Sequence, residues 1–305
     1  MTADTHRAGF VKPNFFIVGA PKCGTTSMAH YLKQHPQIFI SWYKEPHFFG
    51  SDLRAAKYIR DEEKYLNLFR DGGAYPRRGE ASTWYLYSAR AAQEIRAYCP
   101  DARIIAMLRN PIEMSYSLHS HNLYTGSEDV PDFGEALALE AERKQGRRIP
   151  SGAPHPAVLF YREAPKFAAQ LLRYFEAFGR DNVHVVLFDD FRRDTAAVYR
   201  QTLEFLGVDS AFVPEFRVIN ANQRVRSGAI RTVLRNPRLQ RIVRAVVPLQ
   251  LAEAVARGLR AMNTVPEPRP PLEARLRDLL RKEFAPDVAR LSKLLGRDLH
   301  RWIAS

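Results

Sequence analysis

"FFIVGAPKCGTTSMAHYL", residues 15–32, decides the fold of this chain. Four apolar residues lead into Gly19, a second glycine follows at Gly24, and a helical pattern begins directly after it. A strand, a glycine loop and a helix in this order form half of a βαβ unit, with the loop at the carboxyl end of the strand. Backbone N–H groups in such a loop, together with the helix N-terminus behind it, make an anion-binding site.

The loop departs from the phosphate loop of nucleoside triphosphatases. That pattern, G-x-x-x-x-G-K-[ST], has its lysine directly after the second glycine. Here the position holds Thr25, and the lysine lies three residues upstream, at Lys22. The next predicted strand is followed by Arg109 rather than by a magnesium-binding aspartate, so Mg²⁺-dependent triphosphate chemistry fits poorly. Lys22 is instead suited to neutralise a bridging oxygen as a leaving group departs.

Hydrophobic patterning places the remaining elements around this unit. The sequence predicts strands over 14–19, 102–110 and 182–191, helices over 25–35, 162–179 and 195–208, and a long polar loop over 125–156. Strands that alternate with helices indicate an α/β fold with a mostly parallel sheet covered on both faces. We expect one domain, in which residues 1–215 are the catalytic body and 216–305 a basic helical cap.

Composition narrows the class of partner. The chain has 305 residues, a globular composition and a formal net charge of +13, which favours anionic partners such as nucleotides or acidic sugars. Cys23 and Cys99 are the only cysteines, and neither a disulfide framework nor a metal site is expected. Because no apolar stretch has the length of a signal peptide or a membrane span, we expect a cytoplasmic protein.

The glycine loop carries a family resemblance. "GAPKCGTTS", residues 19–27, resembles the 5′-phosphosulfate loop of sulfotransferases that use 3′-phosphoadenosine-5′-phosphosulfate (PAPS). The resemblance implies a P-loop-like three-layer fold, PAPS as donor, 3′,5′-adenosine bisphosphate (PAP) as product, and no metal requirement. It also implies which residues hold the phosphosulfate: Lys22, Cys23, Gly24, Thr25, Thr26 and Ser27.

A second stretch resembles the 3′-phosphate motif of the same family. In "MLRNPIEMSYSLHSHN", residues 107–122, Arg109 ends a strand and Ser117 follows eight residues later. The resemblance assigns both side chains to the 3′-phosphate. An arginine offers forked, charge-assisted hydrogen bonds, and a serine on the following helix adds a neutral donor.

A third stretch suggests the catalytic base. "WYKEPHFFG", residues 42–50, resembles the K-E-x-H-F-F segment of glycosaminoglycan-type sulfotransferases, in which the glutamate is the presumed base. The resemblance gives Glu45 that role and makes His47 its assistant. A carboxylate among these aromatic residues is expected to have a raised pKa.

Two positions depart from that pattern. Gly50 stands where the group often has an aspartate, and Ala81, in "GEASTWYLYS" (79–88), stands where a substrate-contacting lysine is expected. Both departures weigh against a heparan-like polymer as the acceptor. Glu80, Ser82 and Thr83 lie beside this position without an assigned role.

The carboxyl third is basic. "RVRSG", residues 224–228, is the candidate for the family's lid over the nucleotide, and its Arg226, Ser227 and Gly228 are expected near the 3′-phosphate. The basic amphipathic segment over 220–248 either docks on an anionic membrane or packs on the core with its arginines solvated, and we favour packing.

Together these features predict a sulfotransferase that moves a sulfuryl group from PAPS to a hydroxyl of a sugar, glycolipid or small natural product. Two alternatives stay open: a P-loop-type nucleotide kinase, and a non-enzymatic polyanion-binding protein. Neither explains the glycine loop and the Arg109–Ser117 pair together. No nucleic-acid partner is expected, and the sequence does not define the acceptor or the oligomeric state.

Overall fold

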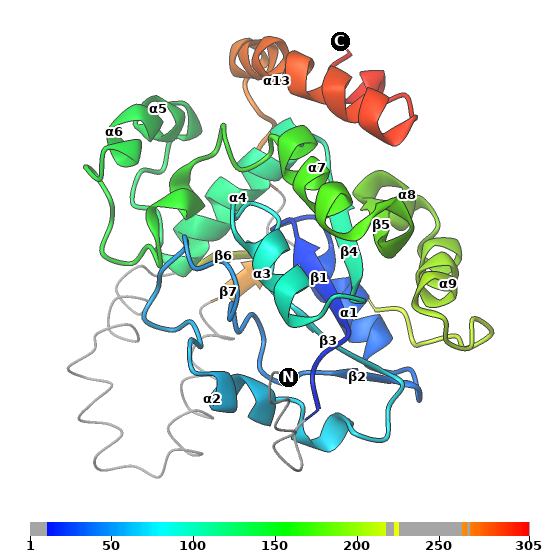
Figure 1. Cartoon of the computed structure of the whole chain (residues 1–305). Coiled ribbons are helices and arrows are strands. Elements are labelled where there is room, and N and C mark those ends of the chain that lie inside the picture. The colour runs from blue at the N-terminus through cyan, green and yellow to red at the C-terminus, as the bar shows by residue number, and fades with distance from the viewer. Residues whose placement is uncertain (1–10, 218–222, 226–263, 267–268, 305) are drawn as a thin grey trace.

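The computed structural model of this chain describes residues 11–217, 223–225, 264–266 and 269–304. Its centre is an all-parallel sheet of five strands in the order β2-β3-β1-β4-β5 (Figure 1). The strands are β1 (Phe15–Gly19), β2 (Ile38–Ile40), β3 (Arg77–Ala81), β4 (Arg103–Leu108) and β5 (Val183–Leu187). A separate antiparallel ribbon joins β6 (Gln223–Val225) to β7 (Thr264–Pro266).

The middle of the sheet is apolar because both of its faces are covered. All five residues of β1 are buried, and so are five of the six residues of β4. Phe16 lies in register with Glu80 of β3 on one side and with Ile104 of β4 on the other. Near-continuous apolar runs of this kind are typical of parallel strands buried on both faces.

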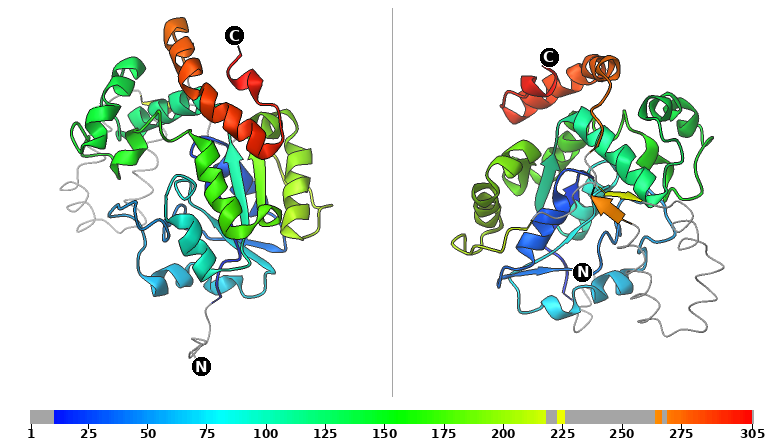
Figure 2. Two further views of the ribbon diagram at one scale, coloured as in Figure 1. Left: turned by 45° about the horizontal axis from the view of Figure 1, so that its top comes forward. Right: turned by 180° about the vertical axis from the view of Figure 1, so that it is seen from behind.

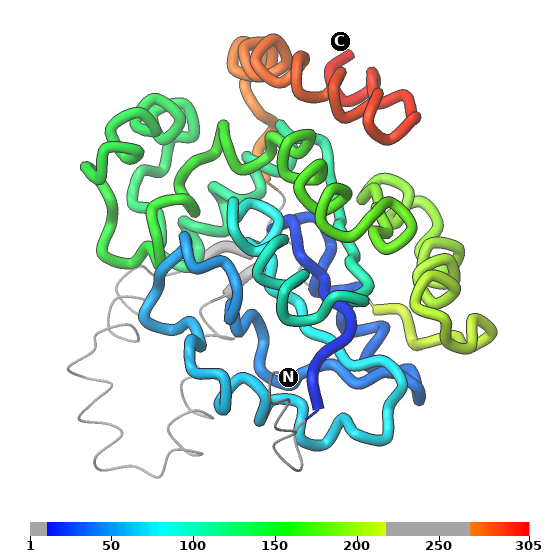
Figure 3. The backbone as a smooth tube through the Cα atoms, viewed as in Figure 1, coloured from blue at the N-terminus to red at the C-terminus, as the bar shows by residue number. Residues whose placement is uncertain are grey.

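Two groups of helices form the outer layers. On one face α1 (Thr25–Leu32) packs with α8 (Phe188–Arg193) and α9 (Thr195–Leu206), where the rings of Tyr31 and Tyr199 meet edge to face. On the other face lie α3 (Ala91–Tyr98) and α7 (Phe167–Phe178), which pack against each other (Figures 1 and 2). The C-terminal helix α13 (Ala274–Leu295) packs on α7 and on α4 (Pro111–Thr125). Figure 3 shows this last segment lying across one end of the molecule.

Shorter helices complete the described chain. They are α2 (Glu62–Asn67), α5 (Phe133–Ala138), α6 (Glu140–Lys144) and the 3₁₀ turns η1 (Arg70–Gly72), η2 (Pro156–Leu159), η3 (Arg180–Asn182) and η4 (His300–Trp302). Within the described ranges, no helix is both long enough and apolar enough to cross a membrane. Cys23 and Cys99 are free thiols.

The predicted fold class, a P-loop-like α/β fold with a parallel sheet between helices, is confirmed. Three expected elements need correction. The third predicted strand, 182–191, ends at Leu187, and the chain then turns into α8. The helix predicted over 162–179 begins only at Phe167, and the loop expected over 125–156 contains α5 and α6. Strands β2 and β3 were not predicted. The division into a body and a cap at residue 215 stays a prediction.

The topology gathers polar residues at one edge of the sheet. The glycine loop follows β1, Thr83 and Trp84 follow β3, and Arg109 follows β4. In open parallel sheets, ligands bind outside the carboxyl ends of the strands.

Candidate active site

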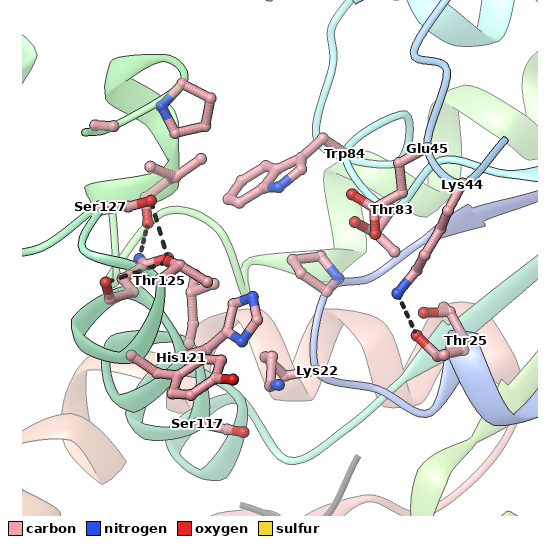
Figure 4. Close-up of a pocket in the computed structure, with 18 of the residues that line it drawn as sticks. Lys22, Thr25, Lys44, Glu45, Thr83, Trp84, Ser117, His121, Thr125 and Ser127 are labelled. Atoms are coloured by element: carbon pink, nitrogen blue, oxygen red, sulfur yellow. Dashed lines mark hydrogen bonds between the residues drawn. The ribbon is translucent and has the colours of Figure 1, made fainter. Parts of the chain in front are cut away.

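A pocket of about 760 Å³ lies at this edge of the sheet. Segments far apart in the sequence line it: the glycine loop and α1, the loop at 44–57, the start of the segment after β3, helix α4, the loop at 151–154, and Arg269. Figure 4 shows Lys44 and Glu45 on one side of the space, with Lys22, Ser117 and His121 across from them. The pocket therefore brings all three of the predicted motifs together.

The glycine loop has the geometry of an anion site. Gly24 has a φ of 90°, and an added Cβ would lie 3.1 Å from the ring of Phe188, so both backbone and space favour glycine. The first helical hydrogen bond of α1 runs from the N–H of Met28 to the carbonyl of Gly24, at 3.1 Å. The N–H groups of the first helical turn, Thr25 to Ser27, are therefore left for a ligand.

Lys22 carries a strongly perturbed charge. Burial, and after it the charges of Arg269, Lys44 and Arg109, together lower the pKa of its ammonium group from 10.5 to about 8. Perturbed pKa values and crowded like charges of this kind are typical of sites that bind an anion or use the shifted proton in chemistry. Lys44 belongs to the same group, because its Nζ donates to Thr26 Oγ1 at 3.1 Å.

Arg109 joins the loop to helix α4. Its Nη1 donates to the carbonyl of Lys22 at 3.2 Å, and its guanidinium lies 4.7 Å from the ring centre of Phe188. A weak ion pair at 3.7 Å connects it with Glu113 in the first turn of α4. Ser117 lies on the pocket side of α4, in the pocket that Arg109 also lines. The assignment of both side chains to a 3′-phosphate stays a prediction.

Glu45 and His47 form a coupled pair. Their side chains approach to 3.5 Å between Glu45 Oε2 and His47 Nε2, with Glu45 27% exposed and His47 3% exposed. Burial alone would raise the pKa of Glu45, but the neighbouring imidazole of His47 and the charges of Lys44 and Lys57 outweigh it and leave that pKa lowered. The expected raised pKa is therefore wrong, since Trp42 is 71% exposed and cationic groups surround the carboxylate.

Sequence reasoning missed several further side chains of the pocket, among them His121 and Arg269. His121 lies one helical turn after Ser117 and lines the pocket; burial first, and then the charge of Lys22, lower its pKa to about 4. Its i+4 spacing from Ser117 is a signal that was available in the sequence. Arg269 follows β7, lines the pocket, stacks 5.6 Å from the ring centre of Tyr116, and has a buried Nη1 with no hydrogen-bond partner.

Comparison with known proteins agrees with this geometry. Residues 12–224 match the sulfotransferase domain family. The chain belongs to the sulfotransferase family. A crystal structure of a sulfotransferase from Alicyclobacillus acidocaldarius is 34% identical, covers 96% of this chain and 100% of its own, and superposes with a TM-score of 0.73. The predicted enzyme class, a sulfotransferase, is thereby confirmed.

Larger relatives share part of this sulfotransferase domain. Human carbohydrate sulfotransferase 15 is 31% identical over 41% of this chain and 30% of its own length. Human bifunctional heparan sulfate N-deacetylase/N-sulfotransferase 2 is 25% identical over 64% of this chain and 22% of its own length. The chain thus spans less than a third of the length of these two relatives.

Not every predicted residue of the sulfotransferase site reaches the pocket. The side chain of Cys23 is fully buried, its Sγ lies 3.5 Å from the carbonyl of Pro21, and its N–H donates to Ala20, so it offers nothing to a ligand. Arg226, Ser227 and Gly228 lie outside the described residues, as does most of the basic segment over 220–248. Among the residues that are described, no His, Cys, Asp and Glu side chains cluster in a way that could hold a metal ion.

Proposed function

We propose that this sulfotransferase moves the sulfuryl group of PAPS to a hydroxyl of a carbohydrate or carbohydrate-like acceptor. One observation carries the proposal: the cationic groups of two motifs, Lys22 with the loop and Arg109 with Ser117, line the same pocket as the carboxylate of Glu45. A donor with an anionic group at each end of a nucleoside would use both cationic sites at once.

The pocket residues fit such a donor. Among the described residues, five cationic side chains line the pocket: Lys22, Lys44, Lys57, Arg109 and Arg269. The buried Nη1 of Arg269 lacks a partner, which is costly unless an anion supplies one. The N–H groups and hydroxyls at the start of α1, with Lys22 and Lys44, are suited to a phosphosulfate. Arg109, Ser117 and Arg269 are suited to a 3′-phosphate.

When bound, PAPS supplies a sulfuryl group attached to a stable leaving group. Glu45 is ionised at neutral pH and takes the proton of the acceptor hydroxyl as its oxygen forms a bond to sulfur. The sulfur–oxygen bond to the nucleotide breaks, and the ammonium of Lys22 neutralises the charge that develops on that oxygen. His47 is neutral and buried, and its contact with Glu45 orients the carboxylate.

The acceptor side of the pocket supports a sugar hydroxyl. Trp84 offers an aromatic surface there, and Thr125 and Ser127 add hydroxyl groups (Figure 4). Lys57 also lines the pocket. The names of the relatives point the same way, since carbohydrate sulfotransferase 15 is among them. The absence of a lysine at Ala81 favours an acceptor smaller than a heparan-like polymer.

The test separates chemistry from binding. Glu45→Gln keeps the shape of the side chain but removes its basicity, so turnover with labelled PAPS is expected to fall at least about a hundredfold. The affinity for PAP, measured by calorimetry, is expected to stay within about twofold, because the ligands of the nucleotide are other residues. A variant that turns over as fast as wild type would remove Glu45 from the mechanism.

A further inference from the structure

Behind the pocket lies a buried carboxylate that the proposed mechanism does not use. Glu80, the fourth residue of β3, is 1% exposed. Three hydroxyl groups donate to it: Tyr65 Oη at 2.9 Å and Tyr85 Oη at 2.8 Å to Oε1, and Ser82 Oγ at 2.5 Å to Oε2. Among the described residues it has no cationic partner, and neither it nor these three residues line the pocket.

Two of the three hydroxyls also hold the loop that carries the base. Ser82 Oγ accepts the N–H of His47 at 3.0 Å, and Tyr85 Oη accepts the N–H of Phe49 at 3.3 Å. Each of these hydroxyls donates to Glu80 and accepts from the loop. The carboxylate is therefore linked, through the two hydroxyls, to the backbone amides of His47 and Phe49. Tyr65 donates to the same carboxylate but stacks on Phe48 without a hydrogen bond to the loop backbone.

The loop needs outside support for its backbone. Glu45 has a φ of 55° and His47 a φ of 48°, which is the left-handed region that non-glycine residues rarely adopt. Such conformations persist where the surrounding structure holds them in place. A hydrocarbon core at this place would avoid the cost of a buried carboxylate, so packing alone does not explain the polar cluster.

We infer that Glu80 is a positioning residue: through Ser82 and Tyr85 it fixes the backbone of residues 45–49 and so aims the carboxylate of Glu45 at the acceptor. This inference rests on the proposed function, because it gives Glu80 a role only if Glu45 is the base. Preorganisation of this kind matters because a small displacement of a catalytic group lowers the rate strongly.

Three single-atom deletions test the inference. Ser82→Ala and Tyr85→Phe each remove a hydroxyl that links Glu80 to the loop, whereas Tyr65→Phe removes a matched hydroxyl that does not. In the first two variants we expect hydrogen–deuterium exchange in fragments covering residues 44–50 to speed up at least about tenfold, and kcat to fall by a similar factor. Both quantities are expected to stay within about threefold of wild type in Tyr65→Phe, and PAP affinity within about twofold in all three.

Two substitutions of Glu80, one conservative and one not, test the role of this residue itself. Glu80→Gln keeps one acceptor oxygen for the tyrosines, so it is expected to retain more activity and more loop protection than Glu80→Ala. Near-ultraviolet circular dichroism checks that each variant is folded.

The outcomes separate this inference from the proposed function. Equal exchange in the Ser82, Tyr85 and Tyr65 variants would make the cluster an ordinary part of the core and overturn the inference. Glu45→Gln is expected to lose turnover while its loop exchanges as in wild type. If that variant keeps its turnover, Glu45 is not the base, and Glu80 has no role in orienting a catalytic carboxylate. The exchange data still decide whether Glu80 holds the loop.

Discussion

The depressed pKa of Lys22 predicts how nucleotide binding depends on pH. Burial and three neighbouring cations bring this pKa to about 8 in the free protein. A bound anion stabilises the charged form of Lys22 and raises its pKa again. The binding of PAP is therefore accompanied by proton uptake near and above pH 8. The charged fraction of free Lys22 falls from about nine tenths at pH 7 to about one tenth at pH 9, so PAP affinity is expected to fall about tenfold, or about 1.4 kcal/mol.

Calorimetry measures the proton uptake that accompanies PAP binding. Titration of PAP at pH 8 in two buffers of different ionisation enthalpy reports the protons exchanged, and we expect an uptake of about half a proton per PAP. His121, which lines the pocket, does not titrate in this window because its pKa is lowered to about 4. The buried thiol of Cys23, next to Lys22 in the chain, does not titrate there either, because its pKa is raised to about 12. The phosphates of PAP lose their last protons near pH 6.

The control is Lys22→Arg, whose guanidinium stays charged throughout this range. Its affinity for PAP is expected to be lower overall but constant from pH 7 to 9, with no proton uptake. A wild-type protein that binds PAP equally well at pH 7 and 9, with no proton exchanged, would refute the reasoning.

Two further predictions concern stability. Arg143 is fully buried and holds the equally buried Glu128 through two hydrogen bonds, at 2.7 and 2.8 Å, so Arg143→Met is expected to cost about 3–5 kcal/mol in urea unfolding. The double variant with Glu128→Leu is expected to recover most of this loss, and a single variant that loses less than about 1 kcal/mol would contradict the argument. Burial raises the pKa of Glu80 from 4.5 to about 7, so the folded chain holds this proton more tightly than the unfolded chain does. Relative to Glu80→Gln, the wild type is therefore expected to lose up to roughly 3 kcal/mol of stability between pH 4.5 and 8, and a difference that does not vary with pH would be the contrary result.

The fold was predictable where the sequence pattern is strong. The apolar runs of β1 and β4 stand out because both faces of these strands are buried. Strand β3 reads Arg-Arg-Gly-Glu-Ala, and its burial depends on neighbours in space rather than on its own apolar residues. The end of β5 was misread because Phe188 continues the apolar run, although Asp189 and Asp190 in the first turn favour a helix N-terminus there.

The site was predictable where its residues lie within short motifs. Lys22, Arg109, Ser117 and Glu45 all reach the pocket, because each lies just beyond the carboxyl end of a strand or on the helix that follows one. Arg269 comes 160 positions after Arg109 in no recognised motif, and only the fold brings the two together. The pKa of Glu45 was predicted in the wrong direction because local aromatic residues do not reveal the lysines and the histidine that surround it in space.

The most direct test of the account compares PAP with adenosine 5′-monophosphate by calorimetry in the presence of a metal chelator. Because the 3′-phosphate gains charge-assisted hydrogen bonds, wild type is expected to bind PAP about 10- to 150-fold more tightly, and Arg109→Ala is expected to remove most of this difference. Equal affinity of wild type for the two nucleotides, or a preference for ATP with Mg²⁺ in a parallel titration without chelator, would contradict a pocket built for PAPS.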